Sequence, residues 1–122
     1  MDLATLRSYL LSKPGAAEDY PFGPGALVLK VGGKMFALVA ESASPLTISL
    51  KCEPAHAQFL RDSFPAVQPG YHLNKEHWNT VTLDGSISDE GIRAMIDESY
   101  RLVVGGLSKA ARRRLKQDGE VV

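Results

Sequence analysis

The sequence predicts a single α+β domain with two layers, in which helices cover one face of a largely antiparallel sheet. The chain of 122 residues, 44% of them apolar, is long enough for one hydrophobic core and too short for two. Helix-like and strand-like patterns follow one another in the order α-β(3)-α-β(2)-α. No low-complexity linker interrupts them, so residues 1–122 are expected to fold as one domain.

The N-terminal half is expected to hold one helix and three strands. The helix follows Asp2, a capping residue, and carries leucines at helical spacing. Runs of β-forming residues at 26–31 and 34–40 predict a hairpin, because Gly32-Gly33 between them supplies the positive φ of a tight turn. Residues 46–51 alternate apolar and polar side chains, which predicts a strand with one buried face. The residues expected to face outward are Thr47, Ser49 and Lys51.

The C-terminal half is expected to add a helix, a second hairpin and another helix. The first helix begins at Pro54 and ends before Pro65. Its inner face is predicted to carry His56, Phe59, Leu60, Ser63 and Phe64. A strand near 78–83 belongs to the hairpin, and Ser88 caps a helix that Gly105-Gly106 ends. The inner stripe of that helix is predicted to be Ile92, Met95, Ile96, Ser99, Leu102 and Val103.

Basic residues gather in a last helical piece. Five of the 14 basic residues lie at 109–116, and three of these are consecutive: Arg112, Arg113 and Arg114. Such a run can contact phosphate, yet cations also favour the negative C-terminal end of any helix. Residues 108–122 are therefore expected to form a basic tail whose polar end, 117–122, frays.

Composition limits the classes of function. The 14 basic residues balance 14 acidic ones, so any attraction to polyanions or membranes must be local. Cys52 is the only cysteine, and the N-terminus lacks the basic segment and long apolar stretch of a secretion signal. Apolar stretches fall far short of the roughly 20 residues of a membrane-spanning helix. A cytoplasmic protein without membrane association is expected.

The segment GYHLNKEHWN, before and within the strand near 78–83, concentrates the polar and aromatic chemistry of the chain. Lys75 can meet a phosphate, and Tyr71 or Trp78 can stack on a base. The asparagines of the segment can bond base edges or sugars. A structural alternative stays open, because asparagine is common in turns and a single tryptophan usually anchors a core.

Metal binding and catalysis are poorly supported in that segment. His72 and His77 are five residues apart with no cysteine or aspartate nearby, whereas a tight metal site uses three or four ligands. No serine, cysteine or carboxylate stands in a motif that would make a nucleophile or its partner. No enzyme, metal or cofactor is therefore expected. An enzyme or small-ligand site would need a pocket that holds both histidines and a carboxylate.

Other reactive residues are expected to be structural. His56 is predicted to be a hydrogen-bonded core histidine, and Cys52 a small buried side chain without a partner histidine. The adjacent carboxylates Asp89-Glu90 and Asp97-Glu98 point to different sides of their helix, so both pairs are expected to be solvated.

A series of motifs along nearly the whole chain resembles the MmcQ/YjbR family. The central stretch GYHLNKEHWNTV is the most specific of them. The others are Pro21-Phe22-Gly23, Gly33-Lys34-Met35-Phe36-Ala37, Ser49-Leu50-Lys51-Cys52, and Ser99-Tyr100 with Leu102-Val103. The resemblance implies a small bacterial domain of the α-β(3)-α-β(2)-α type, similar to secretion chaperones and distantly to frataxin.

The family is usually described as DNA-binding, through a double-wing arrangement of sheet and hairpins. For this chain the resemblance implies contacts from the central stretch and from the neighbouring strand. These residues are Lys51, Tyr71, His72, Asn74, Lys75, His77, Trp78 and Asn79, to which the basic run adds Arg112, Arg113 and Arg114. Glu76 departs from the family pattern, and its carboxylate beside Lys75 would repel phosphate. The alternative is a protein-interaction or chaperone-like module that meets a protein, or another copy of itself, on the exposed sheet face.

Overall fold

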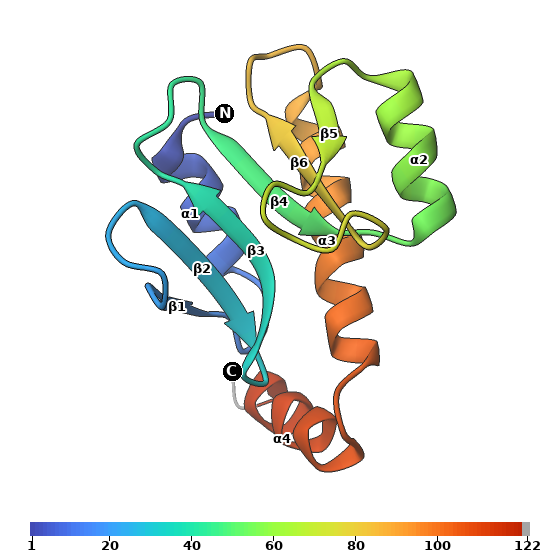
Figure 1. Ribbon diagram of the computed structural model, residues 1–122. Helices are drawn as coiled ribbons and strands as arrows, with labels where there is room; N and C mark the ends of the chain where they lie inside the picture. Colours follow the sequence, from blue (N-terminus) through green and yellow to red (C-terminus); the bar gives the residue numbers. More distant parts are fainter. Residues whose placement is uncertain (121–122) are drawn as a thin grey trace.

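A computed structural model describes residues 1–120 as four helices and six strands around one sheet (Figure 1). In chain order they are α1 (Leu3–Leu11), β1 (Ala17–Asp19), β2 (Ala26–Val31), β3 (Lys34–Ala40), β4 (Thr47–Lys51), α2 (Pro54–Ser63), β5 (Val67–Pro69), β6 (Trp78–Thr82), α3 (Asp89–Gly105) and α4 (Lys109–Glu120). The predicted α+β class is confirmed. The order differs in detail, because β1 was not predicted and α4 is a full helix.

The sheet is antiparallel throughout, with strand order β1-β2-β3-β4-β6-β5. Helices α1 and α3 cover one face, and α2 lies beside β5 and β6 at the edge (Figure 1). Because side chains alternate along strands, cross-strand rows alternate between the two faces. One row lies on the helix-covered face and consists of Leu27, Val39, Ile48, Val81 and Val67. The next row lies on the open face and consists of Val28, Leu38, Ser49, Thr80 and Gln68.

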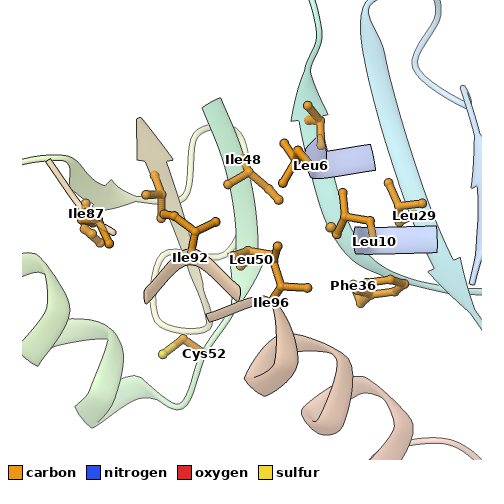
Figure 2. Packing of buried hydrophobic residues seen from close by; sticks show 14 of the residues in the cluster. Leu6, Leu10, Leu29, Phe36, Ile48, Leu50, Cys52, Ile87, Ile92 and Ile96 are labelled. Carbon is orange, nitrogen blue, oxygen red and sulfur yellow. The ribbon is translucent and has the colours of Figure 1, made fainter. Parts of the chain in front are cut away.

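The core lies between the sheet and helices α1 and α3. Figure 2 shows Leu6 and Leu10 of α1 on the same side of the sheet as Ile92 and Ile96 of α3. The predicted caps are present: Asp2 Oδ1 accepts a 2.8 Å bond from the amide of Thr5, and Ser88 Oγ accepts one of 3.1 Å from Gly91. These caps fix where the two core helices begin.

Two elements differ from the prediction, and both lie at the edges of the sheet: β1 was not predicted, and the inner face of α2 was predicted wrongly. β1 has the sequence Ala-Glu-Asp and carries no apolar run, because an edge strand is held by its backbone bonds to β2. On α2 the buried residues are Ala57 and Leu60, whereas Phe59 is 62% exposed and His56 is exposed. The prediction of an inner His56 and Phe59 is wrong because α2 lies at the edge of the sheet, beside β5 and β6, and buries only a narrow stripe of Ala57 and Leu60.

One smaller expectation is corrected, and another stays a prediction. Ser49 was expected to face outward, and it lies on the open face but is buried, with its Oγ 2.8 Å from Thr80 Oγ1. The fraying of residues 117–122 stays a prediction: α4 continues to Glu120, and Val121 and Val122 lie outside the described residues. Within residues 1–120, no helix has both the length and the apolar content needed to cross a membrane.

Candidate functional site

The loop between β5 and β6 holds five of the eleven predicted nucleic-acid residues, and two of its polar side chains bond to the loop itself. Asn74 Oδ1 accepts bonds from the amides of Glu76 (2.9 Å) and His77 (3.2 Å). Lys75 Nζ donates a 2.7 Å bond to the carbonyl of Gly70. Asn74 and Lys75 therefore shape the loop.

Asn79 also serves the fold. Only 3% of it is exposed, and its Nδ2 donates to the carbonyl of Ala57 at 3.3 Å. Its Oδ1 accepts a 2.7 Å bond from Arg61 Nε, and the same guanidinium also donates to the carbonyls of Lys75 and Trp78. Asn79 thus joins β6 to α2, and its amide is already bonded on both sides.

The aromatic side chains of this loop also face solvent. Tyr71 is 70% exposed, and its ring centroid lies 4.0 Å from that of His72. His72 has φ 60°, a left-handed conformation that is uncommon for any residue with a side chain. His77 is exposed, while Trp78 is half-buried on β6 and stands opposite Lys51 of β4. These residues offer ring surfaces and one cation at the ends of two neighbouring strands.

A groove of about 460 Å³ follows the open face of the sheet beside this loop. Apolar and neutral polar side chains line it: Ala26, Leu38, Ala40, Thr47, Ser49, Gln68, Pro69, Tyr71 and Thr80. Among the residues that the structure describes, no charged side chain lines the groove. Its chemistry therefore suits an uncharged or apolar segment better than a phosphate.

Positive charge gathers instead in the C-terminal turn of α3 and in α4. From Ser99 to Gln117 the chain has six basic residues and no acidic one, which we call the basic end: Arg101, Lys109, Arg112, Arg113, Arg114 and Lys116. All six are exposed, and none forms an ion pair with another residue whose side chain the structure describes. By contrast, the preceding residues 84–98 carry five carboxylates and one base.

Glycines let α4 pack closely against the rest of the domain. At Gly32 in the β2–β3 turn, an added Cβ would lie 2.7 Å from Leu107 in the segment before α4. At Gly15 an added Cβ would collide with Leu115 of α4. The antiparallel order places the β2–β3 turn, Lys51 and the β5–β6 loop at the same end of the sheet. Figure 1 shows α4 below the β2–β3 turn, so Arg112 to Arg114 lie on a helix beside that turn.

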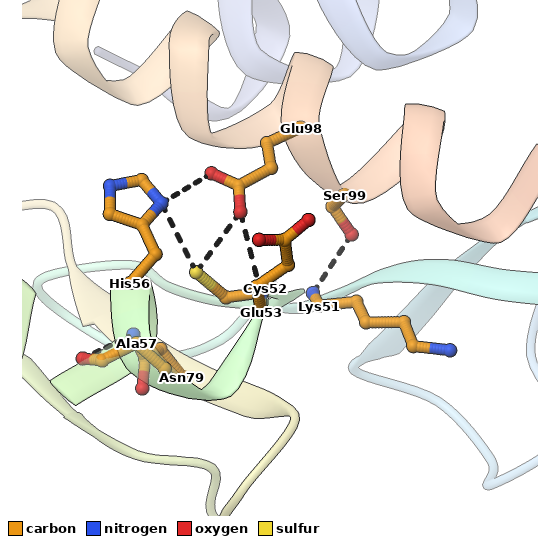
Figure 3. Close-up of polar contacts among 8 residues, drawn as sticks. All are labelled: Lys51, Cys52, Glu53, His56, Ala57, Asn79, Glu98 and Ser99. Carbon is orange, nitrogen blue, oxygen red and sulfur yellow. Dashed lines mark hydrogen bonds and ion pairs between the residues drawn. The ribbon is translucent and has the colours of Figure 1, made fainter. Parts of the chain in front are cut away.

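A second polar cluster joins Cys52, His56 and Glu98, which were expected to be structural or solvated. His56 Nδ1 lies 2.6 Å from Glu98 Oε1 and 3.5 Å from Cys52 Sγ, and Sγ lies 3.3 Å from Glu98 Oε2 (Figure 3). Burial, followed by the hydrogen bond to the Glu98 carboxylate, raises the pKa of the Cys52 thiol to about 12. The free thiol is therefore a proton donor in this cluster and a poor nucleophile at neutral pH.

This cluster corrects three expectations. His56 is a surface residue of α2 paired with a carboxylate, and Cys52 has two polar partners. The side chain of Glu98 is 15% exposed, so it is not solvated, and Asp97 forms an ion pair with Lys13. The Cys-x₃-His spacing across the start of α2 is a weak signal in the sequence that Cys52 and His56 lie together. Glu98 lies 42 residues beyond His56, and only the packing of α3 brings it there.

Comparisons of the sequence and of the structure with known proteins point to the same family. The sequence model of the YjbR family matches residues 11–102. The uncharacterized protein YjbR of Escherichia coli K12 is 38% identical over 117 residues, which cover 96% of this chain and 99% of that one. The uncharacterized protein YbdF of Escherichia coli O157:H7 is 37% identical, with 92% of each chain covered. A crystal structure of a Deinococcus radiodurans protein with domain DUF419 is 40% identical and superposes with a TM-score of 0.89, covering 94% of this chain and 88% of that one.

Proposed function

This chain belongs to the YjbR family, and we propose that it is a nucleic-acid-binding protein that contacts phosphate through its basic end. The observation that carries the proposal is the segregation of charge: six exposed cations and no carboxylate between Ser99 and Gln117, in a chain with no net charge. Phosphate contacts dominate the affinity of most nucleic-acid-binding proteins, and a local cluster is sufficient to supply them.

The remaining exposed residues of the predicted site take a secondary role in this proposal. Lys51 is a further cation at the same end of the sheet, and Tyr71, His72 and Trp78 offer rings on which bases can stack. Asn74, Lys75 and Asn79 hold the loop and contribute indirectly. Glu76 is exposed on the same loop and repels phosphate, so we assign the electrostatic contacts to the basic end.

Fluorescence anisotropy with labelled duplex and single-stranded DNA tests the proposal. The variant R112A/R113A/R114A removes three charges, and R112K/R113K/R114K keeps them at the same positions as a matched control. We expect the parent and the lysine variant to bind at low salt, and the alanine variant to bind at least roughly tenfold more weakly. Equal binding by all three proteins, or no binding even at low salt, would contradict the proposal.

A second candidate function is recognition of a protein segment in the open-face groove. The uncharged lining of that groove is the observation that favours it, because the rest of the surface offers abundant charge. The unpaired polar atoms of an extended peptide could bond the neutral side chains on the groove floor, such as Gln68 and Thr80.

Selection from a library of random extended peptides tests this candidate. Leu38 is half-buried on the groove floor, so Leu38→Glu places a charge in the groove without touching the basic end. Peptides that bind the parent and lose binding to Leu38→Glu would support the candidate. Peptides that bind both proteins equally would refute it, provided that both proteins show the same thermal unfolding.

A further inference from the structure

We propose that Cys52, His56 and Glu98 form a Zn²⁺ site with one open coordination position, between the start of α2 and the middle of α3. The three side chains offer a sulfur, an imidazole nitrogen and a carboxylate oxygen, all within 4.8 Å of one another. Zinc takes each of these three ligand types and usually binds them in a tetrahedral arrangement. The inference is independent of nucleic-acid binding.

The distances between the ligand atoms are close to those of a tetrahedral site. With Zn–S near 2.3 Å and Zn–N and Zn–O near 2.0–2.1 Å, sulfur lies about 3.5 Å from each of the other two ligands. The observed distances from Cys52 Sγ are 3.5 Å to His56 Nδ1 and 3.3 Å to Glu98 Oε2. The two contacts of Glu98 use different oxygens, Oε2 toward Cys52 and Oε1 toward His56, so the carboxylate must turn as the ion replaces these hydrogen bonds. One oxygen then lies about 3.5 Å from Sγ and about 3.3 Å from Nδ1.

The backbone holds all three ligands in place. The amide of Cys52 donates a 2.8 Å bond to the carbonyl of His77, which fixes the turn out of β4. His56 lies in the first turn of α2, directly after Pro54 begins the helix. Glu98 precedes Ser99, whose Oγ donates to the carbonyl of Phe36 (2.5 Å) and accepts from the amide of Lys51 (2.8 Å). Since α3 is thereby tied to β3 and β4, the site is largely preorganised (Figure 3).

The open position faces a cavity. A pocket of about 330 Å³ borders both His56 and Glu98 and continues between α2 and α3 past Phe64, Met95 and Ser86. It leaves room for a water or for a small donor ligand on the ion. Thiolate and carboxylate together neutralise the 2+ charge, and binding releases the thiol proton of Cys52 to solvent. The sulfur ligand disfavours Mg²⁺ and Ca²⁺, which prefer oxygen.

Titration of the chelator-treated protein with Zn²⁺ and Co²⁺ tests the site. We expect one Zn²⁺ per chain by calorimetry, and a thiolate-to-cobalt charge-transfer band in the near ultraviolet with Co²⁺. Glu98→Gln and Cys52→Ser, which keep side-chain shape, should each weaken Zn²⁺ binding by about tenfold or more, since even outer-shell changes cost that much. Cys52→Ser should also abolish the charge-transfer band.

His77→Ala is the matched control, because it removes a different exposed imidazole and keeps the backbone carbonyl that accepts from the amide of Cys52. It should leave the Zn²⁺ affinity unchanged, whereas His56→Ala should weaken it. A Co²⁺ spectrum of the parent protein without a thiolate band would overturn the inference, and this result does not depend on how well any variant folds. The inference would also be overturned if His77→Ala lost Zn²⁺ binding while His56→Ala kept it.

Discussion

Arg61 Nε donates a 2.7 Å hydrogen bond to Oδ1 of the buried Asn79, and so connects α2 to the strand β6. The same guanidinium also bonds the carbonyls of Lys75 and Trp78, at the two ends of the turn that leads into β6. Part of the most specific stretch of the sequence is therefore used to build the β5–β6 loop. A nucleic acid is left with the exposed rings of that loop and with charges from elsewhere.

Asn79→Ala is expected to destabilise the fold without a specific effect on nucleic-acid binding. The change removes the buried side-chain bonds of Asn79 to the carbonyl of Ala57 and to Arg61 Nε, which costs about 1–3 kcal/mol in the free energy of unfolding. Urea denaturation measures this cost, and Gln58→Ala on the exposed side of α2 is the control, expected within about 0.5 kcal/mol of the parent. If Asn79→Ala were as stable as the parent but lost affinity for DNA, Asn79 would be a contact residue after all.

Ser99→Ala is expected to loosen α3 from the sheet. The Ser99 hydroxyl bonds the carbonyl of Phe36 and the amide of Lys51, both just beyond the last residue pair between β3 and β4. Its removal leaves two backbone groups unsatisfied and should lower the free energy of unfolding by about 2 kcal/mol. Ser8→Ala, an exposed change on α1, should have almost no effect in the same urea titration. Equal stability of the two variants would show that the Ser99 bonds contribute little.

Leu115→Ala is expected to release α4 from the domain while the remainder stays folded. Leu115 is a half-buried residue of α4 that packs against Gly15 and the core. Truncating a partly buried leucine costs about 1–2 kcal/mol, and here the loss falls on one helix. Limited trypsin digestion should therefore cut after Arg112, Arg113 or Arg114 faster than in the parent. Unchanged cleavage would mean that other contacts hold α4.

The metal-free Cys52 thiol is expected to resist alkylation until the protein unfolds. Because the folded state raises its pKa to about 12, folding favours the protonated thiol. This contribution to stability is complete below the ordinary thiol pKa and is lost as the pH rises toward 12. At pH 8 with a chelator present, iodoacetamide should react with the folded protein more slowly than with the urea-unfolded chain, by a factor on the order of a hundred. Equal rates would contradict the raised pKa.

Local patterns in the sequence predicted the framework well. The caps at Asp2 and Ser88 and the turn at Gly32-Gly33 depend on residues close together in the chain, and the structure confirms all three. The inner face of α2 and the strand β1 were not predicted correctly, because both depend on what lies at the edge of the sheet.

Contacts that the sequence does not reveal also decide which of the predicted functional residues face solvent and which bond within the fold. Whether Lys75 faces a ligand or its own loop is decided by a carbonyl five residues away in a turn of irregular shape. The cluster of Cys52 and His56 with Glu98 depends on the packing of α3, which no spacing in the sequence encodes. By contrast, the acid-free run that ends in α4 is visible in the sequence, and the structure adds that it is exposed.

The dependence of DNA affinity on salt concentration tests the role of the basic end most directly. Each phosphate contact to duplex DNA contributes about 0.9 to the slope of log affinity against log salt. If Arg112, Arg113 and Arg114 all contact phosphate, R112A/R113A/R114A should lower the magnitude of the slope by about 2.7, and R112K/R113K/R114K should keep it. A slope unchanged by the alanine variant, or binding that does not respond to salt, would contradict phosphate recognition by this helix.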